Sequence, residues 1–310
     1  MSLRSDLYRG TNDIDFLPIW KKSLPGSIGL LVGSVVLLVV LGLNLSIDFD
    51  GGGIYEVPVS DEVTVEDARA VISNSDARIQ TVEDLSGQRF IRVQTGGEAL
   101  DQSDEIVTQL AELGGVEADL VSVNTVGPTW GDQITNRALR ALGLFFVAVA
   151  VYLAWTLEGK MAIGALVAVL HDLLITAGVY SLFRFEVSPA TVIALLTIMG
   201  YSLYDTVVVY DKVLDNTKVA GSLKHGYTRM VSNSMNQVMM RSVNTTLTTV
   251  LPVLSMLVIG GFFLGGAGIR DFALALFIGL LLGTYSSVFL AAPLLAWLHE
   301  RSDAPSTTRS

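Results

Sequence analysis

Six long apolar stretches constrain the fold of this 310-residue chain more than any other feature of its sequence. Crossing a bilayer takes about 20 mostly apolar residues. The six expected spans are 28–45, 138–157, 161–183, 189–210, 243–264 and 272–298. With 51% hydrophobic and 16% charged residues, the chain is too apolar for a soluble protein of this length. The expected fold class is therefore a polytopic α-helical membrane protein with six transmembrane helices, because helices satisfy their own backbone hydrogen bonds in lipid.

The acidic charge is concentrated between the first and second expected spans. The segment from Ser46 to Asn136 holds 18 acidic and four basic residues, whereas the whole chain holds 30 and 20. This segment is expected to be a separate, water-facing domain, and it lacks the basic face that nucleic acid requires. A dense carboxylate surface stays hydrated in strong brine. The charge therefore favours a salt-adapted, halophilic source, with an ordinary acidic surface as the alternative.

Residue alternation and turn residues predict an α+β order in the acidic domain. Thr64, with Asp67 three residues later, has the pattern that caps the start of a helix. Strands are expected at 54–59, 78–82, 88–95 and 119–126, with helices from Thr64 and over 101–113. This β-α-β-β-α-β order is the ferredoxin-like pattern. Its carboxylates form no catalytic constellation, so we expect a binding or moving module.

The positions of Lys and Arg predict the orientation of the chain. Basic residues in short flanking segments favour the cytoplasmic side; twelve lie on the side of the N-terminus, and only Arg184 and Arg270 lie in the short loops opposite. Arg137 and Arg140 run against this bias. Both termini are thus expected inside a multi-pass protein of the cytoplasmic membrane. The expected parts are a cytoplasmic segment 1–27, the first span 28–45, an extracytoplasmic domain 46–137, a five-helix bundle 138–298 with a cytoplasmic loop 211–242, and a cytoplasmic tail 299–310.

Ionisable side chains inside the spans are costly in lipid and therefore mark candidate functional residues. His171 and Asp172 lie near the middle of the third span, with Thr176 one turn later, and Asp205 lies in the fourth. The fifth span runs the opposite way, so Arg241 is expected near the depth of Asp205. A carboxylate that releases an arginine and takes up a proton has two stable states. The alternatives are a static Asp205–Arg241 pair and, for His171 and Asp172, a satisfied contact between helices.

Neighbouring polar residues complete this candidate site, namely Tyr201, Thr206, Asn244 and Thr245. No metal or cofactor is expected, because the chain has no cysteine and its three histidines are too scattered for a zinc site. The sequence also lacks the G-x-x-x-x-G-K-[ST] phosphate loop. Work driven by an ion gradient is therefore favoured over nucleotide-driven work, and an enzyme is not expected.

Several segments together resemble the SecF family of protein-export membrane proteins. The sequence SIDFDGG resembles the family's motif after the first span and includes Asp48, Phe49, Gly51 and Gly52. His171-Asp172 matches a histidine–aspartate pair in the third span. The most specific segment is GYSLYDTVVVYDK at 200–212, and segments 241–249, 271–276 and 283–287 resemble the fifth and sixth spans. Tyr204 departs from the pattern, since bacterial relatives commonly carry Asn there.

The resemblance implies one six-span half of a pseudo-symmetric complex, with a SecD-like protein as the other half. It also implies contact with the Sec translocation channel, a secreted polypeptide substrate and the lipid bilayer. The implied role is to assist Sec-dependent translocation by using the ion (proton) gradient, with Asp205 as the protonating carboxylate and Arg241 as its counter-charge. Together with the acidic surface, it suggests a salt-adapted archaeon as the source. An efflux-type small-solute transporter subunit and a purely structural scaffold subunit remain the alternatives.

Overall fold

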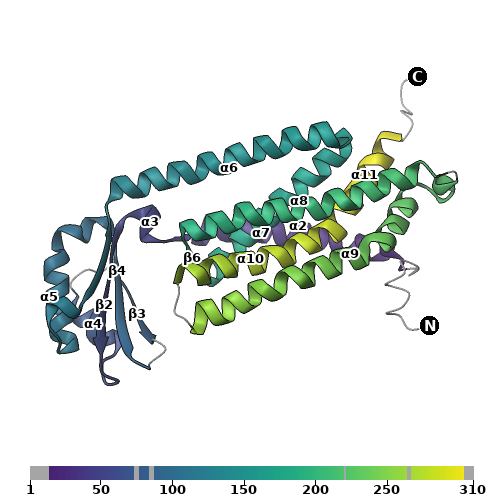
Figure 1. Ribbon diagram of the computed structural model, residues 1–310. Coiled ribbons are helices and arrows are strands. Elements are labelled where there is room, and N and C mark those ends of the chain that lie inside the picture. The colour runs from purple at the N-terminus through teal and green to yellow at the C-terminus, as the bar shows by residue number, and fades with distance from the viewer. Residues whose placement is uncertain (1–13, 73–76, 84–86, 220, 264–266, 304–310) are drawn as a thin grey trace.

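The chain folds into a bundle of long helices with an α+β domain at one end (Figure 1). The computed structural model describes residues 14–72, 77–83, 87–219, 221–263 and 267–303. Within these residues, six helices are long and apolar enough to cross a membrane, as predicted. They are α2 (Phe16–Leu41), α6 (Pro128–Thr156), α7 (Gly159–Phe183), α8 (Pro189–Thr217), α9 (Tyr227–Ser255) with the π-helix η4 (Met256–Phe263), and α10 (Ala267–Ser286) with the π-helix η5 (Ser287–Ala291) and α11 (Ala292–Asp303).

The helices extend beyond the apolar stretches that predicted them. Helix α2 begins at Phe16 rather than at 28, because the Asp15 side chain caps it by accepting a hydrogen bond from the Leu17 backbone nitrogen at 3.3 Å. Most of the expected loop 211–242 is helical, since only 218–226, with the short helix η3 (Ser222–His225), connects α8 to α9. Hydropathy locates the lipid-facing part of a helix, whereas caps and turns set its ends. For the same reason α6 starts at Pro128, before the expected boundary at 137, and α11 continues into the expected tail 299–310 as far as Asp303.

The α+β domain is a four-stranded antiparallel sheet in the order β3-β4-β2-β5. Its elements are β2 (Gly52–Val59), α4 (Val65–Val71), β3 (Arg78–Glu83), β4 (Arg89–Thr95), η1 (Gly97–Gln102), α5 (Ser103–Gly114), η2 (Ala118–Leu120) and β5 (Ser122–Val126). One face buries Tyr55, Val57, Ile91 and Val93 in a core shared with α4 and α5. Alternation along the strands thus holds the helices on one side of the sheet.

The predicted helix cap in this domain is present, and two short 3₁₀ turns shift the other boundaries. The Thr64 hydroxyl accepts from the Asp67 backbone, and the Asp67 carboxylate accepts from the Thr64 backbone at 2.9 Å, which is a capping box. The turns η1 and η2 occupy the first residues of the expected helix at 101 and strand at 119.

The SIDFDGG segment forms the connection between domain and bundle. The short helix α3 (Ile47–Asp50) follows β1 (Asn44–Leu45), which pairs in parallel with β6 (Glu186–Val187). A Cβ at Gly51, whose φ is +74°, would lie 2.9 Å from Pro128 Cα, and one at Gly131 would lie 2.5 Å from the Phe49 carbonyl oxygen. The two segments that connect the domain to the bundle therefore pack directly against each other, which explains why the motif needs small residues.

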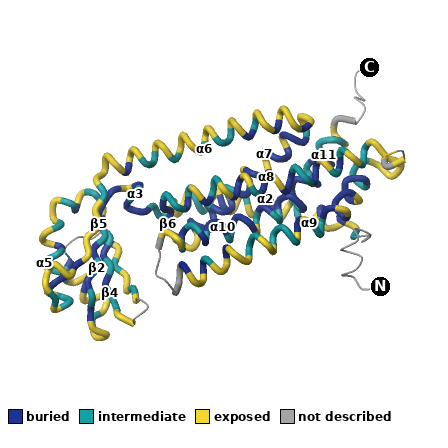
Figure 2. Tube along the Cα trace, in the orientation of Figure 1, coloured by how far each residue is buried: buried dark blue, intermediate teal, exposed yellow. Residues whose placement is uncertain are grey.

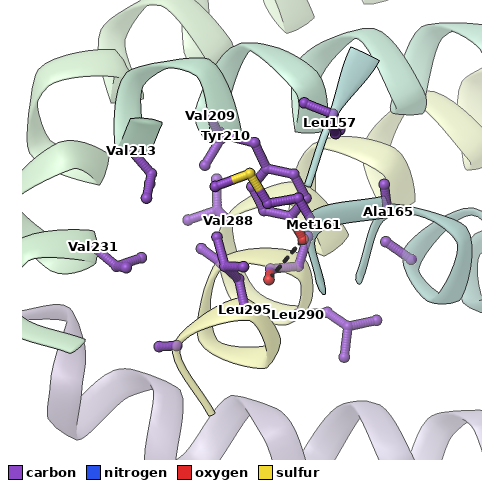
Figure 3. Close-up of a cluster of buried hydrophobic side chains, with 14 of the residues drawn as sticks. Leu157, Met161, Ala165, Val209, Tyr210, Val213, Val231, Val288, Leu290 and Leu295 are labelled. Carbon is purple, nitrogen blue, oxygen red and sulfur yellow. Dashed lines mark hydrogen bonds between the residues drawn. The ribbon is translucent and has the colours of Figure 1, made fainter. Parts of the chain in front are cut away.

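The helices differ in how much of their surface the chain itself covers. Helices α7, α8 and α10–α11 pack around one another, whereas α6 is exposed along most of its length (Figure 2). A large apolar cluster fills the bundle away from the sheet, and Tyr210 in it donates a hydrogen bond to the Ala291 carbonyl oxygen at 3.1 Å (Figure 3). A second cluster, which includes Tyr180, Ile198 and Leu280, lies toward the domain.

Candidate functional site

A layer of buried polar side chains lies where the two apolar clusters of the bundle meet. On α8, Ser202 and Asp205 lie between Ile198 of the cluster near the domain and Val209 of the other cluster, which also includes Leu203. In the sixth span, Leu280 and Val288 take the same two places, with Ser286 and Ser287 between them. The polar layer therefore lies within the spans and within the packed core.

Asp205 is buried between α8 and α9 with one carboxylate oxygen engaged. Oδ1 accepts a hydrogen bond from the Ser242 hydroxyl at 2.7 Å, and the residue is 7% exposed. Among the described residues, Oδ2 has no hydrogen-bond partner. Ser287 approaches Asp205, but its hydroxyl is hydrogen-bonded to the Gly283 carbonyl oxygen and to Thr206. A buried carboxylate oxygen without a donor is an unfavourable place for a negative charge.

Arg241 lies beside this carboxylate without pairing with it. Within the described residues no salt bridge joins Arg241 to Asp205, which differs from the expected direct pair. Its guanidinium donates to the Tyr204 hydroxyl at 2.7 Å and lies 5.7 Å from the centre of that ring. The positive charge still acts on Asp205 through space. The Tyr204 hydroxyl thus holds the arginine away from its predicted partner.

Asp172 is the more deeply buried carboxylate, at 1% exposure. Its Oδ2 accepts from the Ser202 hydroxyl at 2.6 Å and from the Ser286 hydroxyl at 2.7 Å, so three spans meet at one oxygen. Oδ1 lies 3.1 Å from His171 Nδ1, and Thr176 donates to the Asp172 backbone carbonyl at 2.7 Å. The structure therefore brings the predicted His171, Asp172 and Thr176 together with two serines.

Two further hydroxyl pairs extend the polar layer across the bundle. Thr206 contacts Ser287 at 3.0 Å, and Thr246 contacts Thr284 at 2.7 Å. Gly283 permits this approach of α10 to α8, because a Cβ there would lie 2.9 Å from the Ser202 Cβ. Close helix packing through small residues with hydroxyl contacts is the usual way in which membrane helices associate.

The remaining predicted residues lie outside these contacts. Tyr201 packs against the apolar cluster near the domain, and Thr245 donates to the Arg241 backbone carbonyl of its own helix at 2.7 Å. Asn244 is half-buried on α9, and its backbone carbonyl accepts from Thr248 at 2.9 Å. Asp48, Phe49, Gly51 and Gly52 form the junction with the α+β domain instead.

Sequence reasoning missed the serines that contact the carboxylates, namely Ser202, Ser242 and Ser286. Serine carries no charge and is common in membrane helices, so hydropathy does not single it out. Spacing provides no local signal, because Ser202 donates to Asp172, 30 residues earlier, and Ser242 donates to Asp205, 37 residues earlier. Groups of three or more metal-ligating side chains are lacking in the described part of the chain.

Comparison with known proteins identifies the family. Residues 105–301 match the family model described as protein export membrane protein SecD/SecF, C-terminal. The chain is 40% identical over 300 residues to the protein translocase subunit SecF of Streptomyces coelicolor, covering 96% of this chain and 80% of that protein. This chain belongs to the SecF family. It is also 36% identical over 312 residues to SecF of Mycobacterium tuberculosis, covering 97% of this chain and 71% of that protein.

A solved SecF-family fold agrees with this assignment. The crystal structure of SecDF from Thermus thermophilus, a translocon-associated membrane protein, superimposes with a TM-score of 0.81 at 31% identity. The match covers 97% of this chain and 40% of that one, so this SecF-family chain corresponds to part of a longer fused protein. The family is a protein translocase subunit and a multi-pass membrane component of export, not an enzyme.

These relatives also bear on the source of the chain. The SecF relatives described above come from bacteria, so the expectation of a salt-adapted archaeon is not supported. An acidic extramembrane domain is equally compatible with an ordinary charged surface, which was the alternative. The family assignment favours the protein-export interpretation over the efflux-type transporter.

Proposed function

We propose that this SecF-family subunit assists Sec-dependent protein translocation by drawing on the transmembrane ion gradient, with Asp205 as the group that takes up the ion. The observation that carries the proposal is the asymmetry of Asp205. One oxygen is fixed by Ser242 and the other is buried without a donor in the described chain. A proton on Oδ2 would remove the cost of a buried, half-satisfied charge.

Arg241 provides the second state of this site. In the observed arrangement it is hydrogen-bonded to Tyr204, one residue before Asp205. A modest movement of its long side chain would exchange the tyrosine hydroxyl for the Asp205 carboxylate. We propose that the arginine pairs with Asp205 when the carboxylate is charged and returns to Tyr204 when it is protonated, which gives two arrangements of α8 against α9.

The proposal includes an orientation and partners. The described start of α2 and the end of α11 lie at the bundle end away from the sheet (Figure 1), which agrees with six crossings. From the distribution of Lys and Arg we place that end in the cytoplasm and the α+β domain outside. We assign this domain to the ferredoxin-like class from its strand order. The proposed other half of the complex is a SecD-like protein, since the Thermus relative is a SecDF fusion. The other proposed partners are the Sec channel, the exported polypeptide and the bilayer.

Export of a Sec-dependent reporter tests the proposal in cells whose only copy carries Asp205→Asn. Asparagine keeps the size and one acceptor for Ser242 but cannot change charge. We expect export to fall at least several-fold while the membrane level and partner co-purification stay unchanged. Ser255→Ala is a matched control, because Ser255 is exposed on α9 and its hydroxyl donates to the Leu251 carbonyl oxygen of its own helix.

Two other results would reject ion coupling at Asp205. Unchanged export would leave Asp205 and Arg241 as a static packing feature. A loss of membrane level or of partner binding in proportion to the loss of export would support the scaffold interpretation instead.

A further inference from the structure

The polar layer holds a second buried carboxylate whose contacts the proposed role of Asp205 does not use. Asp172 Oδ2 receives two hydroxyl hydrogen bonds, from Ser202 on α8 and Ser286 at the end of α10. Ser202, Ser286 and Asp172 are each at most 1% exposed. Within the described chain, the group in salt-bridge range of Asp172 is His171, at 3.1 Å from Oδ1.

The Ser286 hydroxyl has two acceptors within reach. It lies 2.7 Å from Asp172 Oδ2 and 3.1 Å from the Gly283 carbonyl oxygen. A hydroxyl has one proton, so it donates fully to one acceptor at a time. Ser286 can therefore switch between a side chain on α7 and the backbone of its own helix without moving its Cα atom.

Ser286 also lies at the junction where the sixth span changes from an α-helix to a π-helix. Helix α10 ends at Ser286, and the π-helix η5 begins at Ser287. Backbone carbonyls of η5 accept hydrogen bonds from other spans: Val288 from the Trp20 indole at 3.1 Å, Phe289 from Ser23 at 3.0 Å and Ala291 from Tyr210 at 3.1 Å. π-Helical turns inside α-helices are frequently found at functional sites, and their extra residue shifts the helix register.

We propose that Asp172 is a second proton-binding site, and that Ser286 transmits its charge state to the π-helical turn η5. A proton from solvent binds Oδ2, and the new O–H donates to the Ser286 oxygen, while Ser202 continues to donate to the carboxyl group. Ser286 then turns its own proton to the Gly283 carbonyl. The contact between α7 and the α10–η5 junction thus reverses its direction, and Trp20, Ser23 and Tyr210 act as positioning residues that hold the far side of η5.

A proton fits this site better than a metal ion. The groups around the carboxylate are hydrogen-bond donors at 2.6–3.1 Å, and a proton only reverses one of these bonds. A metal ion would need several oxygen ligands with room between them. The titratable groups on the neighbouring described helices include His171 and Tyr180 on α7, Tyr201, Tyr204, Asp205 and Tyr210 on α8, Asp271 and Tyr285 on α10, and Arg241 on α9, whose guanidinium donates to Tyr204.

Infrared difference spectra of the full chain in lipid nanodiscs, alkaline minus acid, test the proposal. We expect a C=O band of a buried carboxylic acid that Asp172→Asn removes and Asp205→Asn leaves in place. Ser286→Ala and Ser202→Ala keep the carboxyl group, so each should shift the frequency of that band, whereas Ser255→Ala should not. The inference rests on the proposed function only for its link to export, and the spectra read Asp172 separately from Asp205.

Three outcomes would overturn it. The band surviving in Asp172→Asn would show that Asp172 does not titrate. If the band is unshifted in both serine variants, it does not come from Asp172. The serine variants therefore keep the test valid even if Asp172→Asn does not fold. A spectrum that responds to sodium at fixed pH, and not to pH at fixed sodium, would replace the proton by a metal ion. Loss of export in Asp205→Asn with an intact Asp172 response would leave the inference standing.

Discussion

The six spans form two groups, and the candidate site lies in one of them. Within the most apolar stretch of each span, about half of the residues are buried by the chain itself in the third, fourth and sixth spans (56%, 50% and 56%), against 11%, 11% and 17% in the first, second and fifth. The buried residues Asp172, Ser202, Asp205 and Ser286 all lie in the third, fourth and sixth spans. An inner trio of helices thus excludes lipid from the carboxylates, and the outer three complete the site at its edge through Ser242.

This difference predicts that the two groups respond unequally to the same substitution. A Cβ at Gly279 in the inner trio would lie 2.3–2.8 Å from three atoms of Ile198, whereas one at Gly143 on α6 has open space. We expect Gly279→Val to destabilise the folded chain by about 1–3 kcal/mol through overpacking, and Gly143→Val to change stability little. Thermal unfolding in detergent measures both. Equal losses in the two variants would contradict the division into inner and outer helices.

The two carboxylates should also differ in what their removal costs. Asp172→Ala leaves the Ser202 hydroxyl buried without its acceptor, while Ser286 can turn to Gly283. Asp205→Ala leaves the Ser242 hydroxyl without its acceptor but also removes an unpartnered buried oxygen. An unsatisfied buried group costs about 1–3 kcal/mol, so we expect Asp172→Ala to be the more destabilising variant in the same unfolding assay. A larger loss in Asp205→Ala would place the structural role at Asp205.

The sequence predicted much of this arrangement because strong local signals were present. The number of spans followed from apolar length, and the cap at Thr64 followed from a pattern of two residues three apart. Asp172, Asp205 and Arg241 stood out because charge is rare in lipid. Their neighbours did not, because serine is uncharged and the Ser286–Asp172 contact joins residues 114 apart in the chain.

Other features depend on tertiary packing and had no local signal. The pairing of Asn44–Leu45 with Glu186–Val187 involves two-residue strands, which no alternation can mark. At the π-helical turn η5, Trp20 and Tyr210 from other helices donate hydrogen bonds to backbone carbonyls, and these contacts have no local signal in the sequence. The hydrogen bond from Arg241 to Tyr204 joins residues 37 apart in the chain, so no local pattern indicates it.

The smallest expected effect is a pH dependence of stability at the boundary between the inner and outer helices. Glu186 on β6, beside Asn44 after α2, has its pKa raised by burial and by the nearby Asp271 charge, against weaker lowering by Arg92, Arg270 and Arg78. A raised pKa means that the folded chain binds the proton more tightly than the unfolded chain. Glu186 therefore contributes stability that is full below the ordinary pKa of a glutamate and is lost as pH rises through the raised value.

We expect Glu186→Gln to flatten this part of the stability profile, so that the gain on acidification seen in the parent chain is reduced. Asp67 supplies a control of opposite sign. The Thr64 hydrogen bonds lower the pKa of its carboxyl group, so its contribution is present above the ordinary pKa of an aspartate and is lost as pH falls. Unfolding curves measured across this acidic range should therefore change slope in opposite directions for Glu186→Gln and Asp67→Asn. Slopes that change in the same direction would show that Glu186 is solvated in the folded chain. The boundary between the inner and outer helices would then be open to water.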